Sequence, residues 1–353
     1  MTWAIRQYSK GQIDRAGSML LRPGNPDDIN WALDVVNNWR ACHSYPLHAI
    51  KMTLLKRAKK VQSGALIAQR LKRLPSIILK LQQNRHMKLS QMQDIGGCRA
   101  IMPRIHDVRA LVAVYGRSKS KNPRLGRPIE HETYDYIQNP KPDGYRSYHL
   151  IFKYQSASED KQEFQGQRIE IQIRSKLQHT WATAVETVQT FTGQALKSKI
   201  KTGDPDWLRF FALMGSAFAL KERGPLVPGT PQNGNEVRDE IRQLAQKLSV
   251  EHSLRGWGFA VGRVTKNPTH AAAFLLVLDM DNKTLQTTPF RSDELTKASE
   301  KYLEIEKQME QHPELQAVLV SVDSIEDLKA AYPNYYLDTE AFLQAMNQVI
   351  RES

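Results

Sequence analysis

Cysteines and long apolar segments are scarce in this chain of 353 residues. Its two cysteines, Cys42 and Cys98, provide neither a disulfide framework nor the ligand spacing of a zinc site. No apolar run is long enough to cross a bilayer, and the first residues lack the apolar stretch and cleavage site of a signal peptide. A phosphate-binding loop of the form Gly-x-x-x-x-Gly-Lys-[Ser/Thr] is missing as well. We therefore expect a soluble cytoplasmic protein without a membrane partner, and we exclude a P-loop NTPase.

Acidic residues are scarce only in the first two-thirds of the chain. The whole sequence has 50 Lys and Arg against 37 Asp and Glu, a net charge of +13, but residues 231–353 have 13 against 19. The remainder therefore has 37 against 18, which is a net charge of +19. This split favours a basic catalytic or binding domain joined to a more acidic one, with nucleotides or RNA as ligands of the basic part. A solvated basic surface without a ligand is the alternative.

The order of patterns predicts two units of mixed α/β structure. The first sixty residues have apolar positions at helical spacing, and short apolar strands surround a helix near 107–115 between residues 99 and 152. Residues 224–235 have the Gly and Pro content of a linker. The elements expected after it are a helix at 236–249, strands at 257–265 and 272–280, a helix at 293–312 and a strand at 317–322. We therefore expect a domain at 1–223, a linker at 224–235 and a smaller α+β domain at 236–353.

The strongest local signal for chemistry is a strand at residues 167–174. Alternation sends its isoleucines to one face and Arg168, Glu170, Gln172 and Arg174 to the other. A carboxylate is a hard oxygen ligand for Mg²⁺, and arginines neutralise phosphate oxygens. The pattern favours the floor of a site for metal and phosphate, although a solvent-facing amphipathic strand has the same alternation.

A second alternation occurs just upstream, where Tyr145, Ser147 and His149 follow a turn that ends in Gly144. A glycine there lets a ligand approach the backbone closely, and Tyr145 is then available to stack on a base. A buried tyrosine with one hydrogen bond explains the pattern equally well.

Two further segments with charged residues precede these strands in the sequence. The first contains Arg70, Lys72 and Lys80, with Ser76 as the expected N-cap of a helix. The second, Asp94-Ile95-Gly96-Gly97-Cys98-Arg99, places a carboxylate before a small-residue bend and an arginine at the start of an apolar strand. Spacing alone does not bring Asp94 and Glu170 together.

These four segments, in this order, resemble the synthetase motifs of the RelA/SpoT family over residues 45–200. The matching segments are Arg-x-Lys…Ser…Lys at 70–80, Asp-Ile-x-Gly-x-Arg at 94–99, Asp-Tyr-Ile…Pro-Lys…Gly-Tyr-Arg-Ser-x-His at 135–149, Glu-Ile-Gln-Ile-Arg at 170–174 and Gln-His-x-Trp-Ala at 178–182. The resemblance implies a nucleotidyltransferase-like synthetase domain, with a mixed sheet flanked by helices, that transfers pyrophosphate from ATP to a ribose hydroxyl. The hydrolase motif of long family members has no counterpart beyond His106-Asp107.

The resemblance also implies a role for each matching residue. Asp94 and Glu170 would hold Mg²⁺, and Glu170 would help to deprotonate the acceptor hydroxyl. The adenine of ATP would lie between Arg70 and Arg99, and the triphosphate would meet Lys72 and Lys80. The residues expected around the acceptor are Gly144, Tyr145, His149, Gln172 and Arg174. Many members that use guanosine nucleotides carry a lysine where this chain has Tyr134, and this difference puts GDP or GTP in doubt as the acceptor.

The C-terminal segment around Tyr332 and Tyr335 resembles fused toxin–antitoxin members of the family, of the CapRel type. In those proteins a pseudo-zinc-finger domain holds off a toxic synthetase until a phage protein, for example a capsid protein, releases it. The resemblance implies that Tyr332 and Tyr335 block the ATP site and that the acceptor is the 3′ CCA end of tRNA. Ordinary aromatic packing is the alternative for these tyrosines. For the whole chain, the alternatives are a small alarmone synthetase that makes ppGpp- or ppApp-like nucleotides and a non-enzymatic nucleotide- or RNA-binding regulator.

Overall fold

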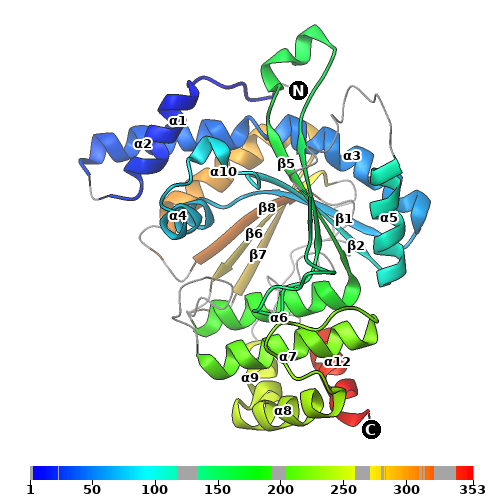
Figure 1. Cartoon of the computed structure of the whole chain (residues 1–353). Coiled ribbons are helices and arrows are strands. Elements are labelled where there is room, and N and C mark those ends of the chain that lie inside the picture. The colour runs from blue at the N-terminus through cyan, green and yellow to red at the C-terminus, as the bar shows by residue number, and fades with distance from the viewer. Residues whose placement is uncertain are drawn as a thin grey trace.

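One sheet of eight strands runs through the protein, and helices cover it (Figure 1). The computed structural model describes residues 3–22, 24–117, 133–192, 204–258, 271–279, 282, 284–309, 312, 315–321 and 339–352. Within these ranges no helix is long and apolar enough to cross a bilayer. The predicted fold class, a mixed sheet flanked by helices, is confirmed.

The strands lie in the order β3-β4-β5-β2-β1-β8-β6-β7. Their bounds are Leu66–Leu71 (β1), Gly96–Met102 (β2), Thr133–Asp135 (β3), Tyr148–Lys153 (β4), Arg168–Ser175 (β5), Ala273–Asp279 (β6), Thr284–Phe290 (β7) and Leu315–Ser321 (β8). The pair β2 and β5 is parallel, and the other neighbouring strands run antiparallel. Ile169, Ile171 and Ile173 of β5 are fully buried, as their alternation predicts.

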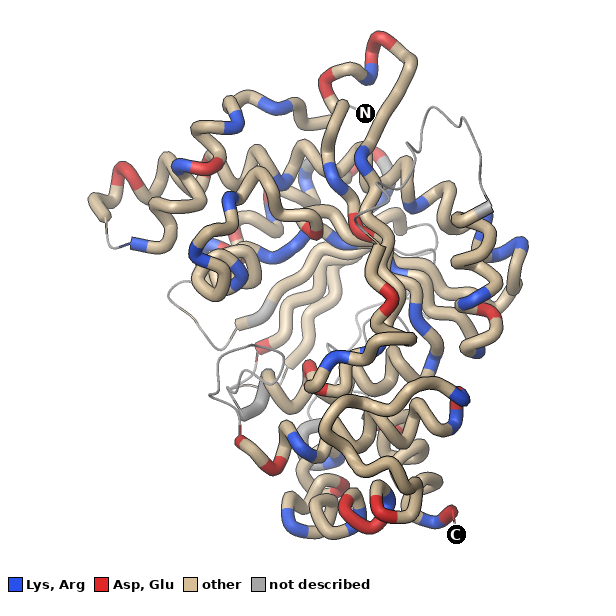
Figure 2. Tube along the Cα trace, viewed as in Figure 1, with Lys and Arg blue, Asp and Glu red and all other residues tan. Residues whose placement is uncertain are grey.

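Five helices accompany the first strands. They are α1 (Lys10–Met19), α2 (Pro26–Ala41), α3 (Ser44–Val61), α4 (Leu74–Gln83) and α5 (Ile105–Arg117). The apolar faces of α3 and α5 pack on the sheet, while α1, α2 and α4 share a separate cluster of buried side chains. Figure 2 shows Lys and Arg recurring along α3, α4 and α5. The expectation that Ser76 caps a helix is wrong, because α4 already begins at Leu74 and its N-cap position is Arg73.

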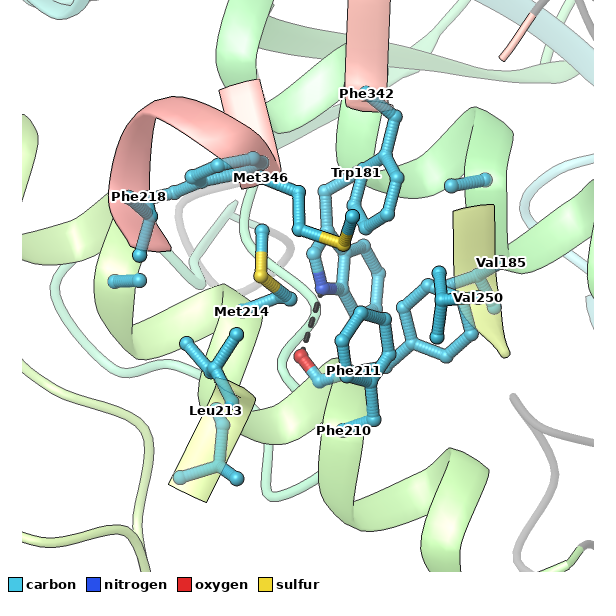
Figure 3. Close-up of a cluster of buried hydrophobic side chains, with 14 of the residues drawn as sticks. Trp181, Val185, Phe210, Phe211, Leu213, Met214, Phe218, Val250, Phe342 and Met346 are labelled. Atoms are coloured by element: carbon cyan, nitrogen blue, oxygen red, sulfur yellow. Dashed lines mark hydrogen bonds between the residues drawn. The ribbon is translucent and has the colours of Figure 1, made fainter. Parts of the chain in front are cut away.

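A second set of helices packs below the sheet in the view of Figure 1. It consists of α6 (Lys176–Thr192), α7 (Pro205–Lys221), α8 (Gly234–Lys247), α9 (Val250–Gly258) and α12 (Glu340–Arg351). Aromatic and aliphatic side chains from all five of these helices pack in one core. The indole of Trp181 donates a hydrogen bond to the carbonyl oxygen of Phe211 at 2.8 Å (Figure 3). The last helix of the chain, α12, contributes Phe342 and Met346 to this core.

The C-terminal residues extend the elements of the first two-thirds of the chain. Strand β8 pairs with β1, with Val320 opposite Arg70, and β6 and β7 continue the sheet beyond it. Helix α10 (Leu295–Gln308) covers these strands. The division into domains at residues 1–223 and 236–353 stays a prediction, but the sheet and the helical core both include residues from each part.

Of the predicted linker, residues 224–233 form a loop against α7, and residues 234 and 235 begin α8. Val227 is fully buried, and its backbone N–H donates a hydrogen bond to the hydroxyl of Ser216 at 2.9 Å. Glycine and proline favour turns both in packed loops and in linkers, so composition alone does not distinguish a packed loop from a linker. Of the strand predicted at 257–265, the first two residues belong to α9 and the others lie outside the described residues.

Candidate active site

The predicted site residues meet on one face of the sheet because of the strand register. In one row across the strands, Arg70 of β1 pairs with Gly97 of β2, which pairs with Glu170 of β5. In the next row Arg99 of β2 pairs with Gln172 of β5. Side chains at paired positions lie on the same face of a sheet, about 5 Å apart between neighbouring strands. The parallel pairing of β2 with β5 therefore joins segments that are about seventy residues apart in sequence, which spacing alone did not predict.

A pocket opens where these rows meet. Its lining residues are Arg70, Lys72, Asp94, Gly97, Cys98, Arg99, Glu170 and Gln172. Both predicted metal ligands and three of the four predicted ATP-binding residues are in this lining. Gly97 and Cys98 also line it but were not predicted as site residues, because small side chains at a bend give no chemical signal.

Two lysines hold the carboxylate of Asp94 on the donor side of the pocket. The ammonium groups of Lys72 and Lys80 each donate to one of its oxygens at 2.8 Å. Burial opposes the charge of Asp94, but the two lysines outweigh it and keep its pKa well below the usual range. Burial also lowers the pKa of Lys72, against the attraction of Asp94. Lys72 and Lys80 therefore share Asp94 as a partner, and their contact with the triphosphate stays a prediction.

A chain of hydrogen bonds links the predicted acceptor residues. Glu170 contacts the Nδ1 atom of His149 at 2.9 Å and accepts from Gln172 at 2.7 Å, and Gln172 accepts from Arg174 at 2.9 Å. The Nε2 atom of His149 and the hydroxyl of Tyr145 are 2.9 Å apart. Four of the five predicted acceptor residues are thus joined to Glu170.

The charges in this chain of contacts shift its pKa values. Burial opposes protonation of His149, but Tyr145 and Glu170 raise its pKa to about 9. Burial raises the pKa of Tyr145, yet the positive charges of His149 and Arg174 outweigh this and lower it to about 8. Burial and the nearby charge of Asp94 raise the pKa of Glu170, but the contact with His149 outweighs them and the net pKa is lowered. Glu170 is therefore ionised at neutral pH. An ionised carboxylate can hold a cation or accept a proton.

Gly144 has a different structural role from the one expected. Its φ of +96° lies in the left-handed region, and a Cβ atom there would lie 2.6 Å from the carbonyl oxygen of Phe211 and 2.9 Å from Trp181. The residue is buried against α6 and α7. Glycine is required at this position by the turn and by protein packing, and the space beside it is filled by the protein.

The segment after Gly144 is anchored to the helical core by a buried ion pair. The guanidinium of Arg146 donates to Glu222 at 2.9 Å, and both side chains are almost fully buried. Gln178 of α6 donates to the same carboxylate at 2.8 Å. These contacts anchor the segment around Tyr145 to α6 and α7. Sequence reasoning missed Glu222, because its partner Arg146 lies 76 residues away.

An aromatic group at the sheet edge was not predicted as part of the site. Tyr134 of β3 pairs with His149, so it lies on the site face. Its ring stacks on that of Tyr136, with 5.8 Å between centroids and 6° between planes. The ammonium of Lys141 lies 4.4 Å from the ring centroid of Tyr136 and 5.3 Å from that of Tyr145. Tyr332 and Tyr335, predicted to be autoinhibitory, lie outside the described residues.

Comparison with known proteins supports the resemblance seen in the motifs. Residues 69–191 match the profile of a family described as "Region found in RelA / SpoT proteins". This segment carries the RelA/SpoT pattern. It contains every predicted catalytic, ATP-binding and acceptor residue, and the family-level resemblance is confirmed over this range. The toxin–antitoxin type stays a prediction.

Solved structures give weaker similarities. A GTP pyrophosphokinase family protein from Streptococcus pneumoniae is 22% identical, with 57% of this chain and 92% of that chain covered and a TM-score of 0.36. For small alarmone synthetase 2 from Bacillus subtilis the values are 19%, 61%, 97% and 0.37. For small alarmone synthetase 1 from Bacillus subtilis bound to its product pppGpp they are 22%, 47%, 84% and 0.36. Similarities this low carry no conclusion about activity. A search of curated proteins finds no match.

Proposed function

We propose that this protein is a pyrophosphotransferase that moves the pyrophosphate group of ATP to a ribose hydroxyl at the 3′ CCA end of tRNA. The observation that carries the proposal is the convergence of two carboxylates, Asp94 and Glu170, with several cations in one pocket of a RelA/SpoT-type region. Catalysis of phosphoryl-type transfer depends mainly on positioning and on neutralising charge. The site has the residues for both tasks.

The donor side would bind ATP through four cations. We assign Arg70 and Arg99 to the adenine, and Lys72 and Lys80 to the triphosphate. A unit positive charge about 4 Å from a phosphate charge is worth about 4 kcal/mol at the dielectric of a protein surface, before desolvation is deducted. Asp94, which lines the pocket, already holds the two lysines, so their side chains are partly positioned before ATP arrives.

The two carboxylates also fit a magnesium site. Among the described residues no three His, Cys, Asp or Glu side chains form a metal-binding group. Mg²⁺ usually binds proteins through one or two carboxylates and completes its shell with water and substrate phosphates. Asp94 and Glu170 line the same pocket and meet this requirement. Bound there, Mg²⁺ would supply charge neutralisation to the triphosphate.

The acceptor side would orient the attacking hydroxyl. We assign Tyr145 to stacking on the acceptor base, with His149, Gln172 and Arg174 around the sugar and phosphate, while Gly144 shapes the turn before Tyr145. Glu170 is ionised and would accept the proton as the hydroxyl oxygen attacks the β-phosphorus and AMP leaves. Its hydrogen bond to Gln172 fixes the orientation of the carboxylate.

The preference for tRNA rests on charge. Residues 1–230 carry a net charge of +19, which suits a polyanion larger than a nucleotide. Pyrophosphorylated CCA ends would stop translation, so the enzyme would be a toxin. We further propose that residues 236–353 regulate it, with Tyr332 and Tyr335 blocking the ATP site until a phage protein, such as a capsid protein, binds.

The decisive experiment offers γ-labelled ATP and Mg²⁺ with bulk tRNA, GDP, GTP or AMP in parallel. Label on tRNA with release of AMP would support the proposal, and label only on a free nucleotide would make the protein an alarmone synthetase instead. No label on any acceptor would overturn both.

Regulation is best tested in the full chain, since removal of the C-terminal residues would uncover the edge of β1 and the helical core. We expect Tyr332→Ala combined with Tyr335→Ala to raise growth inhibition of cells without any trigger. Replacement of both tyrosines by Phe is the matched control for loss of the hydroxyl groups alone. Unchanged growth with the alanine variant would contradict the proposed block.

A further inference from the structure

The face that carries the site continues past the acceptor residues to the edge of the sheet. Across the strands, Arg99 of β2 pairs with Gln172 of β5, Gln172 pairs with His149 of β4, and His149 pairs with Tyr134 of β3. Neighbouring strands are about 5 Å apart, so this row spans about 15 Å. The row therefore extends one strand beyond His149, where the proposed acceptor nucleoside is held.

Tyr134 at the end of this row has an exposed aromatic ring. It is 36% exposed, whereas Tyr136 and Tyr145 are half-buried. Its ring is parallel to that of Tyr136, which in turn meets Tyr145 edge-on at 6.1 Å and His149 edge-on at 5.2 Å. The packing of Tyr136 against these rings fixes its orientation and gives Tyr134 a rigid backing.

The charge beside these rings suits a nucleic-acid strand. The ammonium of Lys141 lies over the rings of Tyr136 and Tyr145, at 4.4 and 5.3 Å from their centroids. Aromatic rings that alternate with cations bind single-stranded nucleic acid, because bases stack on the rings while the cations neutralise the backbone. A mononucleotide acceptor on Tyr145 would leave Tyr134 without a ligand contact.

We propose that Tyr134, backed by Tyr136, stacks on the nucleobase next to the acceptor nucleoside, with the ammonium of Lys141 over the neighbouring rings of Tyr136 and Tyr145. The acceptor is then the unpaired end of an RNA chain. This inference rests on the proposed function and specifies the ligand of its acceptor side. It makes Tyr134 a residue that determines specificity for an oligonucleotide over a free nucleotide.

The test compares the binding of two ligands to the full chain. A 5′-labelled trinucleotide of sequence CCA with a free 3′ hydroxyl is followed by fluorescence anisotropy, and AMP is followed by its competition with a labelled adenosine nucleotide. Base–aromatic stacking is worth about 1–3 kcal/mol, so Tyr134→Ala is expected to weaken trinucleotide binding by roughly 5- to 150-fold. The affinity for AMP should not change.

Tyr134→Phe is the matched control. It keeps the ring and is expected to bind the trinucleotide within about twofold of the wild type, since stacking does not need the hydroxyl. Because the side chain is exposed at an edge strand, neither substitution is expected to prevent folding. Equal losses for both ligands, no loss for either, or a wild type that binds CCA no more tightly than AMP would each overturn the inference.

The binding result can be separated from failure of the proposed function. If tRNA receives label but Tyr134→Ala binds CCA like the wild type, the subsite is wrong and the transfer reaction stands. If the trinucleotide preference depends on Tyr134 but no acceptor receives label, the subsite stands and the proposed reaction is wrong.

Discussion

A buried ion pair between the N-terminal helices and α10 gives the sharpest prediction of stability. The guanidinium of Arg40 meets the carboxylate of Glu306 at 2.5 and 3.2 Å. The two side chains are only 2% and 3% exposed. Glu306 also accepts from the backbone N–H of Leu74 at 3.0 Å and from the hydroxyl of Tyr302 at 2.5 Å, and the Nε atom of Arg40 donates to the carbonyl oxygen of Lys72 at 3.0 Å.

Glu306→Gln removes the negative charge while it keeps the size of the side chain. The guanidinium of Arg40 then stays buried without its counter-charge, and removal of one partner of a buried ion pair costs about 3–5 kcal/mol. A typical protein has a free energy of unfolding of about 5–15 kcal/mol, so the loss is a large share of the total. We expect a clear fall of the urea midpoint, followed by tryptophan fluorescence and circular dichroism.

The matched control is an exposed pair in the same chain. Asp239 and Arg242 of α8 are 65% and 47% exposed, and such surface pairs contribute about 0–1 kcal/mol. Asp239→Asn should therefore leave the urea midpoint almost unchanged. If Glu306→Gln has no larger effect than this control, the pair does not have the burial that the structure gives it.

A second readout separates local from global effects. Glu306 holds the N–H of Leu74, and Arg40 holds the carbonyl oxygen of Lys72, so the pair fixes the segment that delivers Lys72 to the pocket. We expect faster hydrogen exchange at the Leu74 amide in Glu306→Gln under conditions where the protein stays folded. Unchanged exchange there would mean that α10 does not position this segment.

The other predictions concern Glu170 and His43. Glu170→Gln should abolish transfer and leave ATP binding, measured by equilibrium dialysis, partly intact; retained turnover would remove Glu170 from the mechanism. His43 is fully buried, and burial lowers its pKa from 6.5 to about 4. Between these two pH values the unfolded chain binds a proton at His43 that the folded chain does not. The contribution of His43 to the free energy of unfolding is therefore fully present above pH 6.5 and falls by about 3 kcal/mol as the pH drops to 4. His43→Gln should flatten this part of the curve of unfolding free energy against pH, whereas substitution of the exposed His86 should not; equal curves for both variants would refute the assignment.

The face of β5 that lines the pocket was predictable because it follows strand periodicity. Alternation along residues 168–174 correctly put Glu170, Gln172 and Arg174 on one face, and their hydrogen bonds agree with this. The approach of Asp94 to Glu170 was beyond sequence reasoning, since only the parallel register of β2 with β5 brings the two segments together. In the sequence, Tyr134 stands out only as a departure from the family pattern. The pairing of β3 with β4 puts it opposite His149, on the face that carries the site.

The C-terminal third of the chain was predictable in its elements but not in their attachment. The predicted helices near 236–249 and 293–312 and the strands near 272–280 and 317–322 are present, with bounds shifted by a few residues. Their docking follows from backbone pairing and from single buried contacts such as Arg40 with Glu306, which leave no periodic signal in the sequence. Composition carries no information about strand pairing, so the charge split did not indicate that β8 pairs with β1.

The attachment of β8 limits how the proposed regulation can work. Strand β8 covers the edge of β1 next to Arg70, and an uncovered edge strand exposes unpaired N–H and C=O groups. Helix α12 is likewise committed to the helical core through Phe342 and Met346. Release of the whole C-terminal part would therefore break both the sheet and this core. Any regulation of the kind proposed above therefore has to leave β8 and α12 in place.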